Sequence, residues 1–249
     1  MESFNRSVLK ELNEARTGPS SYAEKVRNQL SYYRGSVIHK PNQIPIQTQE
    51  GQQAVMECIQ YLKKAQRAPE LELSSILSRA AQDHCNDIGP KGITGHDGSD
   101  GSSMSDRIEK HGSWDITIGE NIDFGNDDPS EIVMALLIDD GVPNRGHREN
   151  IMNPQFRAVG IGFGAHTVYR HCCTMDFAGG INDCSSRSEP VRAPAKMEFD
   201  DEEIPEGVVE VNTSIETTTK NGKKTTKEVK TFTYSNGSTE TRTTIKEEH

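Results

Sequence analysis

Residues 146–154 form the most informative segment of this 249-residue chain: Gly146-His147-Arg148-Glu149-Asn150-Ile151-Met152-Asn153-Pro154. Two carboxylates, Asp139 and Asp140, precede it in a loop that contains a glycine and a proline. Before that loop, Asp128-Pro129-Ser130-Glu131 places a capping residue, a proline and a glutamate where a helix begins, so we predict a helix through Leu137. After it, alternating apolar residues and glycines over 158–164 predict a strand. The segment therefore joins a helix to a strand through a polar loop that carries a histidine.

Apolar spacing predicts several further elements. The pattern indicates an N-terminal helix that ends at Gly18-Pro19, followed by a second helical stretch over 22–33 and a loop over 35–48. A helical element around 55–62 and a longer helix from Leu73 to Ile88, which ends at Gly89-Pro90, come next. In the final strand, residues 169, 171, 173, 175 and 177 share one face. The order predicts an α+β domain.

Two more short segments carry polar residues. They are Gly95-His96-Asp97-Gly98-Ser99-Asp100-Gly101 and Gly119-Glu120-Asn121-Ile122. Two histidines with several carboxylates on loops or helix ends indicate a divalent-metal or acid–base site. A plainer interpretation stands beside it, in which each histidine bonds a loop carbonyl and each aspartate caps a helix. The twelve-residue calcium pattern with its terminal glutamate is absent, so we do not predict a dedicated calcium site.

In this order, the three segments and Val159-Gly160-Ile161-Gly162 resemble the CAP superfamily, whose domain is also called the SCP domain and which includes cysteine-rich secretory proteins. The resemblance is strong over residues 71–180, and the preceding helices resemble an extension found in a microbial-eukaryote branch. It implies a three-layer α/β/α sandwich. Residues 1–68 would form a helical extension packed on the core, 69–184 the CAP domain, 185–206 an acidic linker and 207–249 a threonine-rich tail.

The family cleft holds two histidines and two acids. Carried over by motif, the two histidines are His96 and His147, and the first acid is Glu120. In the family the second acid lies three residues after a tryptophan; here Leu136 takes the place of that tryptophan, so the second acid is Asp139, with Asp140 beside it as a secondary candidate. Asp139 stands where the family has glutamate, and because its side chain is shorter we expect its contact to be lost or bridged by water. The two imidazoles, His96 and His147, would bind zinc or another divalent cation, and no organic cofactor is expected.

Composition limits the classes of partner. The formal net charge is -10 and the pI is near 5.3, which argues against nucleic-acid binding because that needs clustered lysine and arginine. No apolar run is long enough to span a bilayer. The first residues do not resemble a signal peptide, and the five cysteines lack the spacing of a disulfide framework, so we expect reduced thiols and a cytoplasmic location.

The tail after residue 207 is rich in threonine and alternates in polarity. Asn221-Gly222 and Asn236-Gly237 are typical of tight turns between such runs, which predicts a small three-stranded meander. Disorder is the competing interpretation, because apolar residues are few in this region.

Two functions remain open on the sequence alone. The first is a non-enzymatic binding module with a divalent cation in the cleft and a protein or lipid-like ligand. The second is a protease- or esterase-like hydrolase in which His96, Glu120, Asp139 and His147 act directly or through a metal-bound water. A third interpretation makes the cleft vestigial and assigns the function to the tail.

Overall fold

The computed structural model describes residues 2–41, 44–182, 208–220, 223–234 and 238–248. Its elements, in chain order, are α1 (Glu2–Thr17), α2 (Pro19–Arg27), the 3-10 helix η1 (Asn28–Tyr32), β1 (Tyr33–Arg34), β2 (Val37–Ile38), β3 (Ile46–Gln47), α3 (Gln52–Lys64), β4 (Glu72–Leu73), α4 (Ser75–Lys91), α5 (Met104–Glu109), β5 (Ser113–Phe124), α6 (Pro129–Ile138), α7 (Gly146–Met152), β6 (Ala158–His166), β7 (Arg170–Asn182), β8 (Val208–Lys220), β9 (Lys223–Tyr234) and β10 (Thr239–Glu248).

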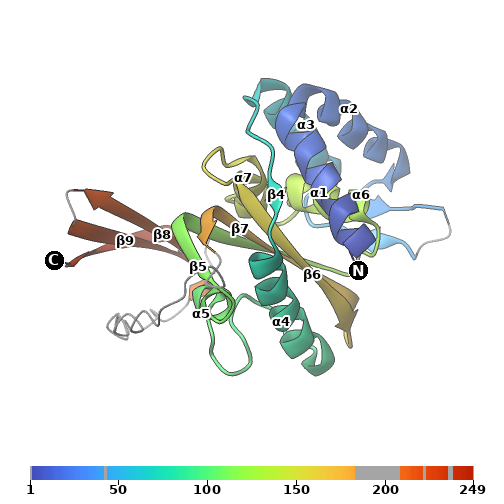
Figure 1. Ribbon diagram of the computed structural model, residues 1–249. Helices are drawn as coiled ribbons and strands as arrows, with labels where there is room; N and C mark the ends of the chain where they lie inside the picture. The colour runs from blue at the N-terminus through green and yellow to red at the C-terminus, as the bar shows by residue number, and fades with distance from the viewer. Residues whose placement is uncertain (1, 42–43, 183–207, 221–222, 235–237, 249) are drawn as a thin grey trace.

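The described strands form a seven-stranded sheet in the order β10-β9-β8-β5-β7-β6-β4, and its part made of β5, β7, β6 and β4 is the middle layer. Strands β5, β7 and β6 pair antiparallel, and the short β4 pairs parallel to β6. Helices α4 and α5 lie on one face of this sheet, and helices α1, α6 and α7 lie on the other (Figure 1). The predicted three-layer α+β sandwich is confirmed.

Strand β6 shows how the sequence separates the two faces. Val159 and Ile161 are buried in the main apolar core, whereas Gly160 and Gly162 face α4. A Cβ atom on Gly160 would lie 2.0 Å from the carbonyl carbon of Leu77, and one on Gly162 would lie 2.4 Å from that of Ala81. The glycines therefore allow the backbone of α4 to lie directly on the strand.

The N-terminal helices share the core of the sandwich. Apolar residues of α1, α2 and α3 form one buried cluster with those of α6, β6 and β7. The guanidinium of Arg16, at the end of α1, is fully buried and donates to backbone carbonyls beyond α3 and around the end of α7. Helices α1, α2 and α3 are therefore packed into the same body as the sandwich.

Several local predictions were wrong. Helix α4 continues through Gly89-Pro90 to Lys91, because Gly92 adopts the left-handed conformation and closes the helix end there. Leu73 belongs to strand β4 instead of that helix, and the stretch over 35–48 contains the short β2 and β3. Strand β5 was not predicted. Its residues are continuously buried only over 117–123, so they show no alternation of apolar and polar side chains, and Ile116 interrupts the strand at a bulge with φ 75°.

Strands β8, β9 and β10 form an antiparallel meander that extends the sheet beyond β5 (Figure 1). The junction is narrow, with Thr117 of β5 opposite Glu216 of β8. The predicted acidic linker over 185–206 and the two predicted Asn-Gly turns lie outside the described residues.

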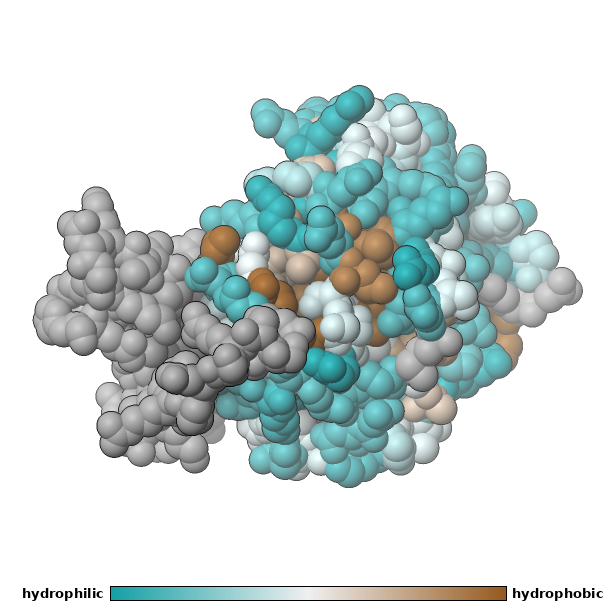
Figure 2. All heavy atoms as spheres, in the orientation of Figure 1, coloured by the Kyte–Doolittle hydropathy of each residue, from teal (hydrophilic) through white to brown (hydrophobic). Residues whose placement is uncertain are grey.

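The face of the molecule seen in Figure 2 is largely hydrophilic, and hydrophobic surface is gathered near its middle. Among the described residues, no helix combines the length and apolarity that a membrane span requires. Four cysteines, at positions 58, 85, 172 and 173, are buried free thiols, and Cys184 lies outside the described part of the chain.

Candidate functional site

The first histidine of the site is held by a buried ion pair. His96 lies in the loop after α4, and its Nδ1 is 2.8 Å from Oε1 of Glu120 on β5. The other oxygen of Glu120 accepts a hydrogen bond of 2.7 Å from Arg107 on α5. The side chains of Glu120 and Arg107 are each only 3% exposed, whereas that of His96 is 47% exposed. The imidazole therefore has a buried acid behind it and solvent in front.

The charges of this cluster support one another. Burial alone would raise the pKa of Glu120, but the hydrogen bond from His96 and the charge of Arg107 outweigh it and hold the pKa below its usual range. Desolvation lowers the pKa of His96, yet the hydrogen bond and charge of Glu120 raise it overall. Asp176 lies opposite Glu120 on β7, and burial followed by the charge of Glu120 raises its pKa well above normal. Of these two carboxyl groups, Glu120 therefore ionises first and Asp176 keeps its proton to higher pH.

The second histidine has its own acid. His147 is the second residue of α7. Its Nδ1 is 2.7 Å from Oδ1 of Asp139, and its backbone N–H donates to Oδ2 of the same residue at 3.0 Å. Asp139 is the C-cap of α6 in the left-handed conformation, which turns its side chain toward α7. The expected loss or water bridging of this contact is wrong, because the backbone compensates for the shorter side chain.

Two asparagines connect the histidine pairs. The Asn121 side chain, one residue after Glu120, donates to the carbonyl of His147 at 2.9 Å. Asn150 of α7 donates in return to the Asn121 side chain at 2.9 Å and to the Glu120 carbonyl at 3.3 Å. Helix α7, with its histidine, is thus fixed to the strand that carries the other acid.

Sequence reasoning missed four residues that hold the site: Arg107, Asn121, Asn150 and His84. His84 is fully buried in α4, and its Nε2 is 2.9 Å from the carbonyl of Gly95, directly before His96. Asn121 and Asn150 lie within the segments 119–122 and 146–154 that carry the family resemblance, so the sequence did indicate that they lie near the site. Nothing in the spacing of Arg107 or His84 indicates that they reach the same loop and strand.

The structure also separates residues that the sequence left together. Asp140 does not join Asp139 at His147, and its carboxylate accepts instead from the backbone N–H groups of Gln49 and Glu50. The plain interpretation, in which the candidate histidines bond loop carbonyls, is wrong for His96 and His147, since both rings bond carboxylates.

The imidazoles of His96 and His147 are the donors that this site offers to a cation. In each pair we assign the Nδ1 proton to the bond with the carboxylate, which leaves Nε2 as the ligand atom, an arrangement common behind metal-binding histidines. Each carboxylate oxygen of Glu120 and Asp139 already accepts one hydrogen bond. Within the described ranges no cluster of three or more histidine, cysteine, aspartate or glutamate side chains is placed to hold a metal. The residues therefore fit at most a two-imidazole site, and they do not fit a closed structural zinc site.

A family model for the cysteine-rich secretory protein family, CAP, matches residues 9–177, well over half of the chain. The chain belongs to the CAP family. The match begins inside α1, so it takes in most of the N-terminal helices of this CAP protein as well as the sandwich.

Individual relatives of this CAP protein are distant. The uncharacterised protein YkwD of Bacillus subtilis is 30% identical over 109 residues, which are 44% of this chain and 40% of the relative. An SCP-domain extracellular protein of Bacillus anthracis matches at 24% identity and a TM-score of 0.37, over 51% of this chain and 39% of that one. An outer surface protein of Borrelia burgdorferi matches at 20% identity and a TM-score of 0.38, over 45% and 78%.

One further acid lies close to the second pair and yields a prediction. Asp123 on β5 is buried, and burial raises its pKa to about 6 despite the hydrogen bonds from Asn126 and the charge of His147. Because the folded protein holds this proton more tightly than the unfolded chain, ionised Asp123 lowers stability as the pH rises through that range.

We therefore expect Asp123→Asn to stabilise the protein more at about pH 7 than at about pH 4, by roughly 2–3 kcal/mol. Asparagine keeps an oxygen that can accept from Asn126. Urea unfolding of both proteins at both pH values measures the difference. A stability difference that does not change with pH would contradict the assignment.

Proposed function

We propose that this CAP protein is a non-enzymatic binding module that holds a divalent cation between His96 and His147. One observation carries the proposal: each of these imidazoles has a buried carboxylate on Nδ1 and an Nε2 without a hydrogen-bond partner in the described part of the chain. A carboxylate in this position fixes the ring and raises the basicity of the other nitrogen.

The consequences for affinity follow from the number of ligands. Two protein ligands leave the other coordination positions to water or to oxygen atoms of a bound ligand, so we expect modest and pH-dependent cation affinity. Imidazole donors suit zinc and other first-row divalent metals, and we take zinc as the test ion. We propose that a protein or lipid-like ligand, the class suggested by the family resemblance, completes the site.

A hydrolase is the second candidate, because a histidine backed by a carboxylate is also a suitable general base. In the described residues no hydroxyl or thiol is hydrogen-bonded to the ring of His96 or His147, so water would have to be the nucleophile. The binding module requires no such step, and we favour it.

Zinc titration calorimetry on the full chain tests the proposal. We expect one zinc per chain, and a loss of at least about tenfold in affinity for His96→Ala and for His147→Ala, since each removes one of two ligands. His111→Ala is the matched control, because His111 also bonds a carboxylate, Asp83, on another part of the surface. Unchanged affinity in both site variants would refute the proposed cation site.

The same proteins should be assayed with mixed peptide and ester substrates. Turnover that disappears in His96→Ala or Glu120→Ala would establish the hydrolase instead. Zinc binding without turnover that depends on His96 supports the binding module.

A further inference from the structure

The loop between α6 and α7 is held in an unfavourable backbone conformation. Asp139 and Arg145, at its two ends, both adopt left-handed conformations, with φ values of 58° and 53°. Such conformations are unfavourable for residues other than glycine and persist where surrounding contacts impose them. The loop therefore needs an external support to keep the Asp139 carboxylate directed at His147.

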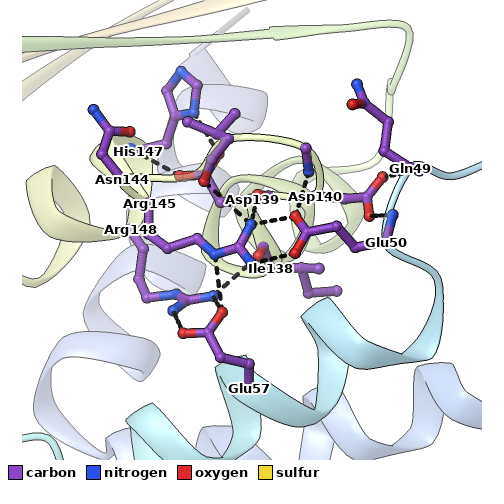
Figure 3. A network of polar contacts seen from close by, with 12 residues as sticks. Gln49, Glu50, Glu57, Ile138, Asp139, Asp140, Asn144, Arg145, His147 and Arg148 are labelled. Atoms are coloured by element: carbon purple, nitrogen blue, oxygen red, sulfur yellow. Dashed lines mark hydrogen bonds and ion pairs between the residues drawn. The ribbon is translucent and has the colours of Figure 1, made fainter. Parts of the chain in front are cut away.

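Arg145 supplies the contacts within the loop. Its guanidinium turns back and donates to the carbonyls of Asp139 at 2.6 Å and Val142 at 3.2 Å (Figure 3). This closes the loop on itself and satisfies the carbonyl of the residue whose side chain binds His147. Arg145 thus fixes both ends of the loop at once.

The remaining donors of Arg145 point to the N-terminal part of the chain. Glu50 accepts through both oxygens, each at 2.6 Å, and Glu57 of α3 accepts at 2.9 Å (Figure 3). The side chain of Arg145 is only 15% exposed, whereas those of its acceptors Glu50 and Glu57 are 33% and 44% exposed, so the contact joins a half-buried guanidinium to carboxylates that still reach solvent. A planar guanidinium facing both oxygens of one carboxylate defines orientation as well as distance.

A second set of contacts runs in the opposite direction. The carboxylate of Asp140 accepts from the backbone N–H groups of Gln49 and Glu50 at 2.7 and 2.8 Å. Glu50 in turn accepts from the backbone N–H of Gly141 at 2.7 Å. The segment before α3 and the loop before α7 are therefore tied together reciprocally, by side chains of both.

Glu57 extends this support to helix α7. It accepts from Arg148 at 2.7 Å, and Arg148, almost completely buried next to His147, donates to the carbonyls of Leu137 and Ile138 at the end of α6. These are carbonyls that a helix terminus leaves without partners. The two guanidiniums of Arg145 and Arg148 therefore face the two carboxylates of Glu50 and Glu57.

We propose that Glu50 and Arg145 are positioning residues through which the N-terminal segment sets the orientation of His147 in the cation site. The proposal rests on the proposed function for its consequence, but its geometry is independent of it. The orientation of the His147 ring, unlike that of His96, then depends on the carboxylate of Glu50, 97 residues earlier in the chain.

The test uses full-length metal-free protein and the nitrogen–proton NMR signals of its imidazoles. A histidine N–H bonded to a carboxylate is protected from exchange, so both His96 and His147 should give Nδ1–H signals in the unaltered protein. In Glu50→Gln we expect the His147 signal to exchange at least about fivefold faster while the His96 signal is unchanged. His96 therefore serves as an internal measure of the overall fold.

Two further variants complete the test. Glu24→Gln is the matched control, because Glu24 is an ion-paired carboxylate on α2 that bonds Arg27 and Lys63 and no residue of the loop. Arg145→Lys keeps the charge but loses the planar fork, and it should reproduce the effect of Glu50→Gln even if the latter folds poorly. An unchanged His147 signal in both loop variants would overturn the proposal.

Zinc titration of the same variants gives the functional consequence. We expect affinity to fall about fivefold to tenfold in Glu50→Gln and to be unchanged in Glu24→Gln. If the unaltered protein binds no zinc, the proposed function fails, whereas the exchange of the His147 proton still decides whether Glu50 and Arg145 position the ring.

Discussion

Replacing Arg16 by Met is expected to lower the free energy of unfolding by about 4 kcal/mol. The guanidinium is completely buried, and it donates to the carbonyls of Pro69, Ile151, Asn153 and Phe156 at 2.6 to 3.0 Å. Burial, and next the charge of Arg157, lower the pKa of Arg16 to about 10. Methionine matches the length of the side chain but leaves four carbonyls without their donor.

The control for this prediction lies on the same helix. Arg6 pairs with Glu2 one turn away on the surface of α1, and Arg6→Met should change stability by no more than about 0.5 kcal/mol. Urea unfolding of the three proteins measures both effects. If Arg16→Met costs less than about 1 kcal/mol, Arg16 does not hold α1 to the end of α7 as described.

The second large effect concerns the acid behind His96. Arg107→Met removes the buried cation that faces Glu120 at 2.7 Å, and we expect stability to fall by about 3 kcal/mol. Most of this loss arises because ionised Glu120 stays buried beside Asp176, which carries a carboxyl group of its own. The Nδ1–H signal of His96 should broaden in the same variant, since Glu120 then takes up a proton more easily.

A double-mutant cycle separates the pair from its surroundings. Arg107→Met with Glu120→Gln should recover about 2 kcal/mol relative to the sum of the single changes, because the uncompensated charge is gone. Lys91→Met provides the control, since Lys91 pairs with Asp87 on the surface nearby and should cost at most about 0.5 kcal/mol. Additive single changes would show that Arg107 and Glu120 do not form a buried pair.

The elements that the sequence predicted well are those with local signals. Asp128 does cap α6, with its carboxylate accepting from the N–H groups of Ser130 and Glu131, as the Asp-Pro-Ser-Glu pattern indicates. Of the five residues predicted to share a strand face, 173, 175 and 177 do so in the core, as alternation in a strand requires, whereas Tyr169 precedes β7. Both predictions depend on neighbours within a few residues.

The site was predicted only as far as the motifs reach. His96, Glu120, His147 and Asp139 came from the family resemblance, and the structure pairs them two by two. The resemblance also put Asp139 ahead of Asp140 at the acid position. Its direct contact with His147 was not expected, because this contact depends on a left-handed helix cap that turns one carboxylate to His147 and the next to residue 49.

The supporting contacts were not accessible either, for a different reason. Arg145 bonds Glu50 across 95 positions of the chain. Arg107 lies on a helix and Glu120 on a strand, and no spacing in the sequence indicates that the two residues meet. Charged residues at such separations are usually expected to be solvated, and only the packed structure shows that Arg107 and Glu120 are buried and that Arg145 is 15% exposed. The same limit applies to Arg16, which the helical pattern of α1 places on the buried face without naming a partner.

The most direct measurement of the cation site is X-ray absorption at the zinc edge of the loaded, full-length protein. If His96 and His147 bind one ion, the spectrum will contain two imidazole nitrogens at about 2.0–2.1 Å, with oxygen atoms in the remaining positions. A spectrum with no imidazole, with one, or with sulfur ligands would contradict the assignment of these two histidines to a shared cation.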